Sequence, residues 1–171
     1  MNINVKIINL DRTVIADLIK ILFLIGFLTI VPVFHNQMVT GPLVNAILFI
    51  ATYLFNIRIA VLIGLIPSAV ALSIGLLSPV LGPMVPFIMT ANILLVISFN
   101  YFKNKNYWLG IGISSLLKFV FLSNVSLIVF KLIVKKEIAV GLANMMGWPQ
   151  LITSLTGGLI AYVFLRKIRK I

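Results

Sequence analysis

The sequence predicts an all-α integral membrane protein, a bundle of about six transmembrane helices with both termini in the cytoplasm. Hydrophobic residues make up 61% of the 171 residues and charged residues only 10%, and the mean hydropathy is +1.19. A soluble domain carries roughly a quarter charged residues. The apolar residues fall in long runs, which favour helices over the alternating pattern of a β-barrel. At about 20 residues per crossing, we expect a single transmembrane domain over residues 1–171.

Six apolar runs define the expected spans. The first follows Lys6 and Arg12, as in a signal peptide, but no small-x-small cleavage site follows it. We therefore expect this run to be retained as a helix. The second span is short and the fifth is long enough to tilt. The six expected spans are 13–34, 42–57, 59–77, 83–102, 107–134 and 149–165.

The distribution of basic residues predicts the orientation. Nine lysines and arginines flank the ends expected inside, against three on the outer flanks. This bias places both termini in the cytoplasm. The inner residues are Lys6, Arg12, Arg58, Lys103, Lys105, Arg166, Lys167, Arg169 and Lys170, and the outer ones are Lys131, Lys135 and Lys136.

Glycine and proline precede each helix expected to start outside. The pairs are Gly41-Pro42 and Gly82-Pro83, and Gly147-Trp148-Pro149 is the third case. Proline suits a first helical turn, so these are ordinary helix starts on one interpretation. On the other, three helix N-termini point at one external cavity and favour an anionic or polarised group there.

Polar side chains gather in the first outer loop, around the only histidine of the chain. They carry no fixed charge, and their donors and acceptors suit an uncharged polar ligand. Solvation of an exposed loop is the alternative. The candidate ligand-binding residues of this loop and the following turn are His35, Asn36, Gln37, Thr40 and Asn45.

Lys118 lies near the expected bilayer midplane, because it follows Trp108 by ten residues of helix, or ~15 Å. A mid-membrane ionisable group is costly and is a functional candidate by default, although it can also be satisfied by neighbouring carbonyls. Asn92 falls at a similar depth. Further residues expected to line the same outward-facing cavity are Asn124, Trp148 and Gln150.

Small residues recur at a step of about four in the third span, at Ala60, Gly64 and Ser68. Such residues let helix backbones approach closely. Packing within the bundle is one interpretation, and a docking face for a membrane partner is the other.

Composition excludes several kinds of chemistry. There are no cysteines, so thiolate catalysis and cysteine-ligated metal clusters are excluded. We predict no catalytic residues, no metal site and no cofactor, because one histidine and three acids on both membrane faces form neither a triad nor a metal cage. The net charge of +11 is interpreted as a topology signal and contact with anionic lipid, not as a nucleic-acid surface.

Several stretches resemble a known group of membrane proteins. The stretches HNQMVTGPLVNAILFIATYLF, IGLIPSAVALSIGLLSPVLGPMVPFIM, KNKNYWLG and WPQLITSLTGGLIAY, with the six-helix plan, resemble the substrate-binding S components of energy-coupling factor (ECF) transporters. Similar sequences have also been labelled "iron hydrogenase", a chemistry that the absence of cysteine excludes here.

The resemblance implies a membrane-embedded subunit for uptake of a vitamin, precursor or similar solute across a bacterial or archaeal cytoplasmic membrane. It also implies a transmembrane coupling subunit and separate cytoplasmic ATPases. S components typically present alanine-x-x-x-alanine on the first helix, but here the residue four positions after Ala16 is Lys20. The small-residue stripe of the third span is an alternative docking face. Two other classes stay open: an assembly protein without ligand, and a membrane enzyme acting on lipid.

Overall fold

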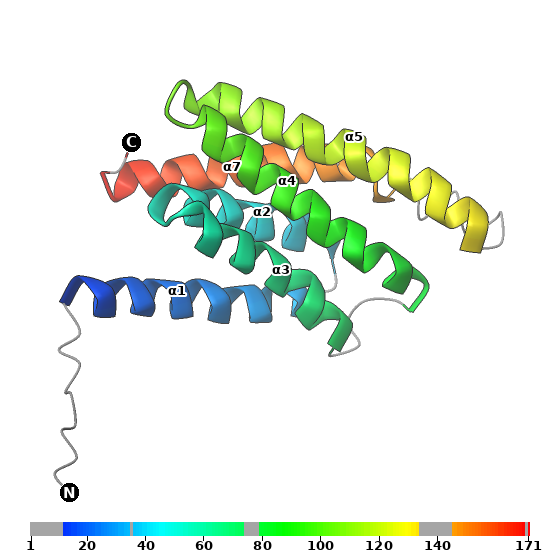
Figure 1. Ribbon diagram of the computed structural model, residues 1–171, viewed down its shortest axis with the longest axis horizontal. Coiled ribbons are helices and arrows are strands. Elements are labelled where there is room, and N and C mark those ends of the chain that lie inside the picture. The colour runs from blue at the N-terminus through cyan, green and yellow to red at the C-terminus, as the bar shows by residue number, and fades with distance from the viewer. Residues whose placement is uncertain (1–11, 35, 74–78, 134–144, 170) are drawn as a thin grey trace, which may run out of the picture.

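The computed structural model describes residues 12–34, 36–73, 79–133, 145–169 and 171, and these are almost entirely helical (Figure 1). No strand occurs within the described ranges. In chain order the helices are α1 (Arg12–Ile30), the 3-10 helix η1 (Val31–Phe34), α2 (Gln37–Leu54), α3 (Ile57–Ser73), the 3-10 helix η2 (Pro79–Met84), α4 (Val85–Phe102), α5 (Tyr107–Ile133) and α7 (Trp148–Lys167).

The fold is the predicted all-α membrane bundle. Five helical segments are long and apolar enough to cross a bilayer, and α3, described over 17 residues, is a shorter apolar helix beside them. The apolar side chains on their outer surfaces face away from the bundle, as lipid-facing residues do. The protein is therefore a multi-pass membrane protein, and its six main helices match the six expected spans.

The turns and helix ends fall into two groups, which lie at opposite ends of the bundle. The start of α1, the α2–α3 and α4–α5 turns and the end of α7 lie together at one end (Figure 1). This end, called the basic end below, carries Arg58, Lys103, Lys105, Arg166 and Lys167. The starts of α2 and α7 and the end of α5 lie at the other, called the cavity end. The basic turns that are expected on one side of the membrane thus lie together at one end of the bundle.

Two of the three expected Gly-Pro helix starts are wrong. Helix α2 begins at Gln37, five residues before Pro42, because the Asn36 side chain caps it by accepting a 2.9 Å hydrogen bond from the Met38 amide. Gly82 lies in η2, and α4 begins only at Val85. Only Gly147, the N-cap of α7, fits the prediction. Gly-Pro pairs therefore do not mark the three helix starts, although residues at the starts of α2 and α7 do line one cavity.

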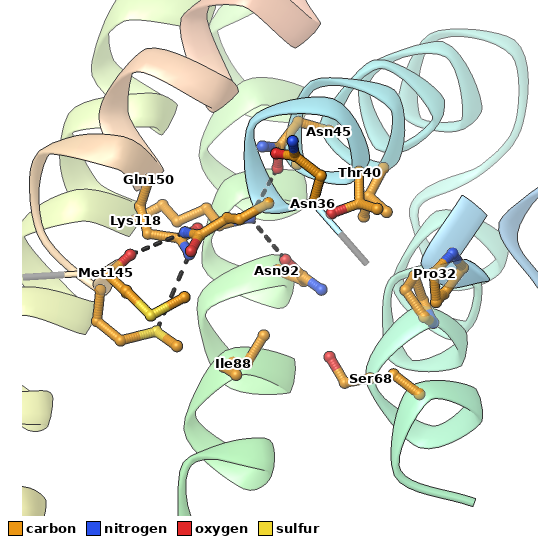
Figure 2. A pocket seen from close by; sticks show the side chains of 16 residues that line it. Pro32, Asn36, Thr40, Asn45, Ser68, Ile88, Asn92, Lys118, Met145 and Gln150 are labelled. Atoms are coloured by element: carbon orange, nitrogen blue, oxygen red, sulfur yellow. Dashed lines mark hydrogen bonds between the residues drawn. The ribbon is translucent and has the colours of Figure 1, made fainter. Parts of the chain in front are cut away.

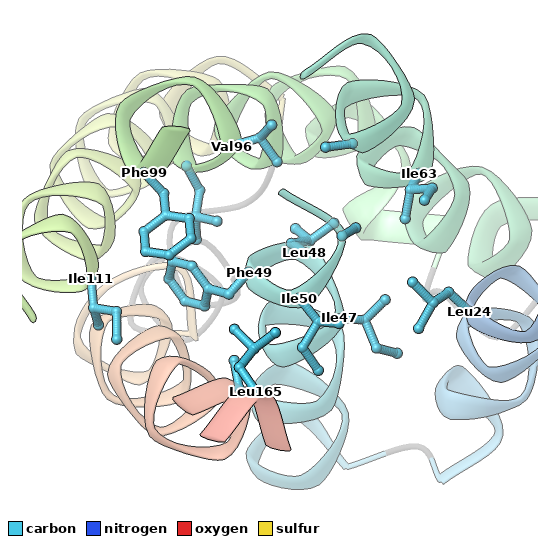
Figure 3. Close-up of a cluster of buried hydrophobic side chains, with 14 of the residues drawn as sticks. Leu24, Ile47, Leu48, Phe49, Ile50, Ile63, Val96, Phe99, Ile111 and Leu165 are labelled. Carbon is cyan, nitrogen blue, oxygen red and sulfur yellow. The ribbon is translucent and has the colours of Figure 1, made fainter. Parts of the chain in front are cut away.

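A core of apolar side chains fills the half of the bundle nearer the basic end (Figure 3). The rings of Phe49 and Phe99 meet edge to face with centroids 4.7 Å apart, and both are fully buried. Ring contacts continue from Phe99 to Tyr107 and on to Tyr162. These contacts join α2, α4, α5 and α7 into one packed unit.

Helices α2 and α7 approach closely because of a glycine. A Cβ added at Gly157 would lie 2.6 Å from the Asn45 Cβ and 2.8 Å from both the Ala46 nitrogen and the Pro42 carbonyl oxygen. Two of these three neighbours are backbone atoms, so they cannot turn aside. Glycine at this position sets the spacing that brings α2 into the bundle, and with it the Asn45 side chain.

The membrane orientation remains a prediction from charge, and reporter fusions test it. We expect fusions at Arg58 and Lys103 to report cytoplasm, and fusions at Thr40 and Val80 to report the outside, because translocating the basic turns is unfavourable. A fusion at the C-terminal Lys170 should also report cytoplasm. An outside signal at Lys170 would contradict the arrangement with six crossings.

Candidate functional site

The described residues form a cavity of about 270 Å³ between the helices in the half of the bundle nearer the cavity end (Figure 2). Lys118 lies at its deep end, and polar residues from the start of α2 lie at its mouth. Its lining consists of Pro32, Asn36, Gln37, Thr40, Gly41, Val44, Asn45, Pro67, Ser68, Ala71, Ile88, Asn92, Lys118, Met145, Met146 and Gln150.

Lys118 is held by two asparagines from two other helices. Its Nζ donates to Asn45 Oδ1 on α2 at 2.6 Å and to Asn92 Oδ1 on α4 at 2.8 Å. All three side chains are buried, and Lys118 is only 3% exposed. Figure 2 shows the lysine reaching across from α5 to the two amides. Bonds to neutral amide oxygens satisfy donors of the amine but bring no opposite charge.

The Asn92 side chain is in turn fixed by α3. Its Nδ2 donates to the Gly64 carbonyl oxygen at 3.0 Å, which leaves Oδ1 to face the lysine. A Cβ at Gly64 would lie 3.6 Å from the Asn92 Cβ, so the small residue keeps α3 close to α4. A supporting hydrogen bond of this kind orients a binding group before any ligand arrives. The polar network thus joins α2, α3, α4 and α5.

At the mouth, a hydrogen bond spans from the start of α2 to the segment before α7. Gln37 Nε2 donates to the Met145 carbonyl oxygen at 2.8 Å. Gln150 lies on the same side and makes a long contact of 3.9 Å with the Met146 sulfur. Gln37 and Gln150 are exposed or half-buried, in contrast to Lys118. The mouth is therefore the part of the cavity nearest to solvent.

The structure brings seven of the ten predicted ligand-binding residues to this cavity. They are Asn36, Gln37, Thr40, Asn45, Asn92, Lys118 and Gln150. His35 lies outside the described residues. Whether the seven bind a ligand stays a prediction. Lys118 and Asn92, which are expected at a similar level along their helices, do contact each other in the cavity.

Two of the predicted ligand-binding residues lie elsewhere. Asn124 is exposed and donates to the Val120 carbonyl of its own helix, so its polar group is already satisfied on the outer surface of α5. Trp148 is 68% exposed and its ring lies against Phe119, with centroids 5.2 Å apart. The prediction that these two residues line the cavity is wrong.

The small-residue stripe of α3 faces inward. Ala60, Gly64 and Ser68 are buried within the bundle, with Gly64 against α4 and Ser68 lining the cavity. A partner protein cannot reach them in this structure, so the docking interpretation is wrong and internal packing is correct. Ala16 on α1 is exposed and accessible from the membrane.

The apolar walls of the cavity are not predicted from the sequence. Val44, Pro67, Ala71 and Ile88 line it beside the polar residues. Nothing in the sequence separates these from lipid-facing residues, because both are apolar. Pro67, inside α3, is the one recognisable signal, since proline leaves a backbone carbonyl without its helical partner and often marks a cavity in a membrane helix.

The arrangement of the site is suited to binding. Within the described ranges, no three His, Cys, Asp or Glu side chains come together to hold a metal ion. The polar groups at the deep end are an amine and two amides, and the walls are apolar. A mostly apolar pocket with a few convergent polar groups is the usual form of a small-molecule site.

Fold and site together define a multi-pass helical membrane protein with a largely apolar cavity whose deep end is polar. No family model, no curated protein and no solved structure matches the chain. The functional conclusion therefore depends on the geometry of the site.

Proposed function

We propose that this protein is a membrane-embedded solute-binding subunit for uptake of a small molecule across a bacterial or archaeal cytoplasmic membrane, energised by a separate ATPase module. The observation that carries the proposal is Lys118, buried at 3% exposure yet lining a cavity. An ionisable group at mid-membrane depth costs ~2.5–3.5 kcal/mol on insertion scales. A binding role gives a reason for retaining it.

An assembly protein without ligand is the second candidate, and the cavity argues against it. A protein that only packs against other subunits gains nothing from placing a lysine and two asparagines around an open space, because each buried polar group adds a desolvation cost. A filled apolar core of the same volume is more stable. The polar deep end and the open cavity together favour a ligand.

The resemblance to ECF S components supplies the rest of this proposal. It suggests a vitamin, a vitamin precursor or a similar solute, and a transmembrane coupling subunit with cytoplasmic ATPases. The sequence has no Gly-rich phosphate loop with a Walker lysine, so the energy source is expected on another chain. Ala16 on the exposed face of α1 is the remaining candidate for contact with the coupling subunit.

Reconstitution tests the proposal. The protein purified from cells grown in rich medium is expected to carry a small molecule that mass spectrometry detects after denaturation. In liposomes containing this protein alone, a proton or sodium gradient should not accumulate that molecule, because the proposal assigns the energy for uptake to ATP hydrolysis on a separate module.

Uptake driven by an ion gradient alone would contradict the need for an ATPase module. Protein that carries no small molecule, and takes up none from a medium extract, would favour the assembly role. A boiled sample and empty liposomes carried through the same steps are the controls.

A further inference from the structure

We propose that the cavity selects a small carboxylate with an apolar body, and that Lys118 is the counter-ion of its carboxylate. This inference rests on the proposed solute-binding function and names the class of solute. It is carried by the charge, the free donors and the wall chemistry around Lys118.

Lys118 has no acidic partner among the described residues. Among the described residues the single acid is Asp17, and its carboxylate pairs with Lys20 on the exposed face of α1 at 2.7 Å. The partners that Lys118 has within the described structure are the neutral amides of Asn45 and Asn92. A cation of this depth without a counter-charge is unfavourable. An anionic solute supplies the missing charge when it binds.

The second argument is the set of hydrogen-bond donors that remain. An ammonium group has three donors, and two of them are taken by Asn45 and Asn92. Because Asn45 turns its oxygen toward the lysine, its Nδ2 is also available, and no described residue accepts a hydrogen bond from it. The deep end of the cavity therefore offers two donors next to each other. A carboxylate has two acceptor oxygens and no donor, which matches this pair.

The third argument is the remainder of the cavity. Val44, Pro67 and Ile88 form apolar walls above the polar deep end. The volume of about 270 Å³ lies just below the ~300–1,000 Å³ of sites for drug-sized ligands. These features favour a small solute with one charged end and an apolar body. A phosphate monoester fits less well, because it carries nearly two negative charges and a single lysine faces them.

The test compares the parent protein with Lys118→Met and, as a matched control, Lys103→Met. Lys103 is likewise a hydrogen-bonded lysine, but its acceptor is the Thr52 backbone carbonyl and it lies at the basic end away from the cavity. Each protein in nanodiscs is incubated with a small-molecule extract of the growth medium, washed and denatured. The released compounds are analysed by mass spectrometry before and after esterification of carboxyl groups. We expect the parent and Lys103→Met to release the same carboxylic acid.

Binding of the released acid and of its primary amide is then measured for each protein. Losing a charge-assisted hydrogen bond weakens affinity about 10- to 150-fold, so Lys118→Met should bind the acid that much more weakly. The parent should bind the amide more weakly than the acid by a similar factor. This comparison uses the parent alone, so it does not depend on the folding of a variant. Glu137 is an acid outside the described residues. Glu137→Gln should bind the acid as the parent does, since the solute and not Glu137 is expected to balance Lys118.

The outcomes separate this inference from the function on which it rests. Release of no compound by the parent would overturn both. Release of a neutral or cationic compound, or equal affinity of the parent for acid and amide, would overturn the carboxylate and leave solute binding intact. A loss of acid binding in Glu137→Gln as large as in Lys118→Met would also overturn it, because the lysine would then have a carboxylate partner within the protein.

Discussion

Asn92→Leu is expected to lower the free energy of unfolding by about 3 kcal/mol, more than any other single change at the polar network. The substitution removes the acceptor of a Lys118 hydrogen bond and the donor to the Gly64 carbonyl. Hydrogen bonds to a charged group contribute ~1.5–3 kcal/mol, and a buried group left unsatisfied adds a desolvation cost. The lysine remains in place with one partner fewer.

Lys118→Met should cost much less, within about 1 kcal/mol of the parent, because it removes the buried amine itself and keeps most of the stem volume. The two asparagine oxygens that lose their donor line the cavity, where water can take its place. The double variant Asn92→Leu/Lys118→Met should therefore recover stability relative to Asn92→Leu alone. Unfolding in mild detergent, followed for all four proteins, gives the coupling energy between the two residues. Strictly additive effects would show that Asn92 does not hold the lysine.

Gly157→Ala is the second variant with a large expected effect. Its Cβ would lie 2.8 Å from the backbone nitrogen of Ala46 and from the backbone oxygen of Pro42, so α7 and α2 must separate. Overpacking of this kind costs ~1–3 kcal/mol, and backbone neighbours place this case at the upper end. Because Asn45 belongs to the same contact, the affinity for the solute should fall as well.

Gly112→Ala is the matched control, since a Cβ at Gly112 meets nothing within 4 Å. We expect its unfolding free energy to stay within ~0.5 kcal/mol of the parent. The measurement is the unfolding midpoint of the three proteins in the same detergent, together with solute binding. Equal stability of the two alanine variants would mean that the close approach of α2 and α7 is not needed for the fold.

Much of the fold follows from hydropathy alone. The long apolar runs end at basic or polar turns, so the spans were placed close to the observed helices; the fifth, expected over 107–134, is observed as Tyr107–Ile133. The start of α2 was misplaced because Pro42 was preferred over the capping side chain of Asn36. The shift matters for the site. With α2 starting earlier, Asn45 is two turns into the helix and at the level of Lys118.

The level of a residue along its helix could be predicted from the sequence, whereas the direction of a side chain around its helix could not. Lys118 and Asn92 were grouped correctly because both lie near the middle of their helices. Asn124 is expected farther out along the same cavity, but it follows Lys118 by six residues, a rotation of ~240° about the helix, and it lies on the outer surface. The small residues Ala60 and Gly64 are a second example. Their spacing predicts that they share one face of α3, but it does not predict which helix or partner covers that face.

The packed rings of Phe49 and Phe99 lie between the cavity and the basic end, so they bear on whether ions can leak through the bundle. Both rings are fully buried, and they belong to the apolar core that the described helices form on the side of the basic end. On the proposed function, we expect a solute bound in the cavity to exchange with one face of the membrane only, because this apolar core lies beyond the deep end. The same core is then expected to let the protein hold a charged solute within the membrane without an ion leak through the bundle.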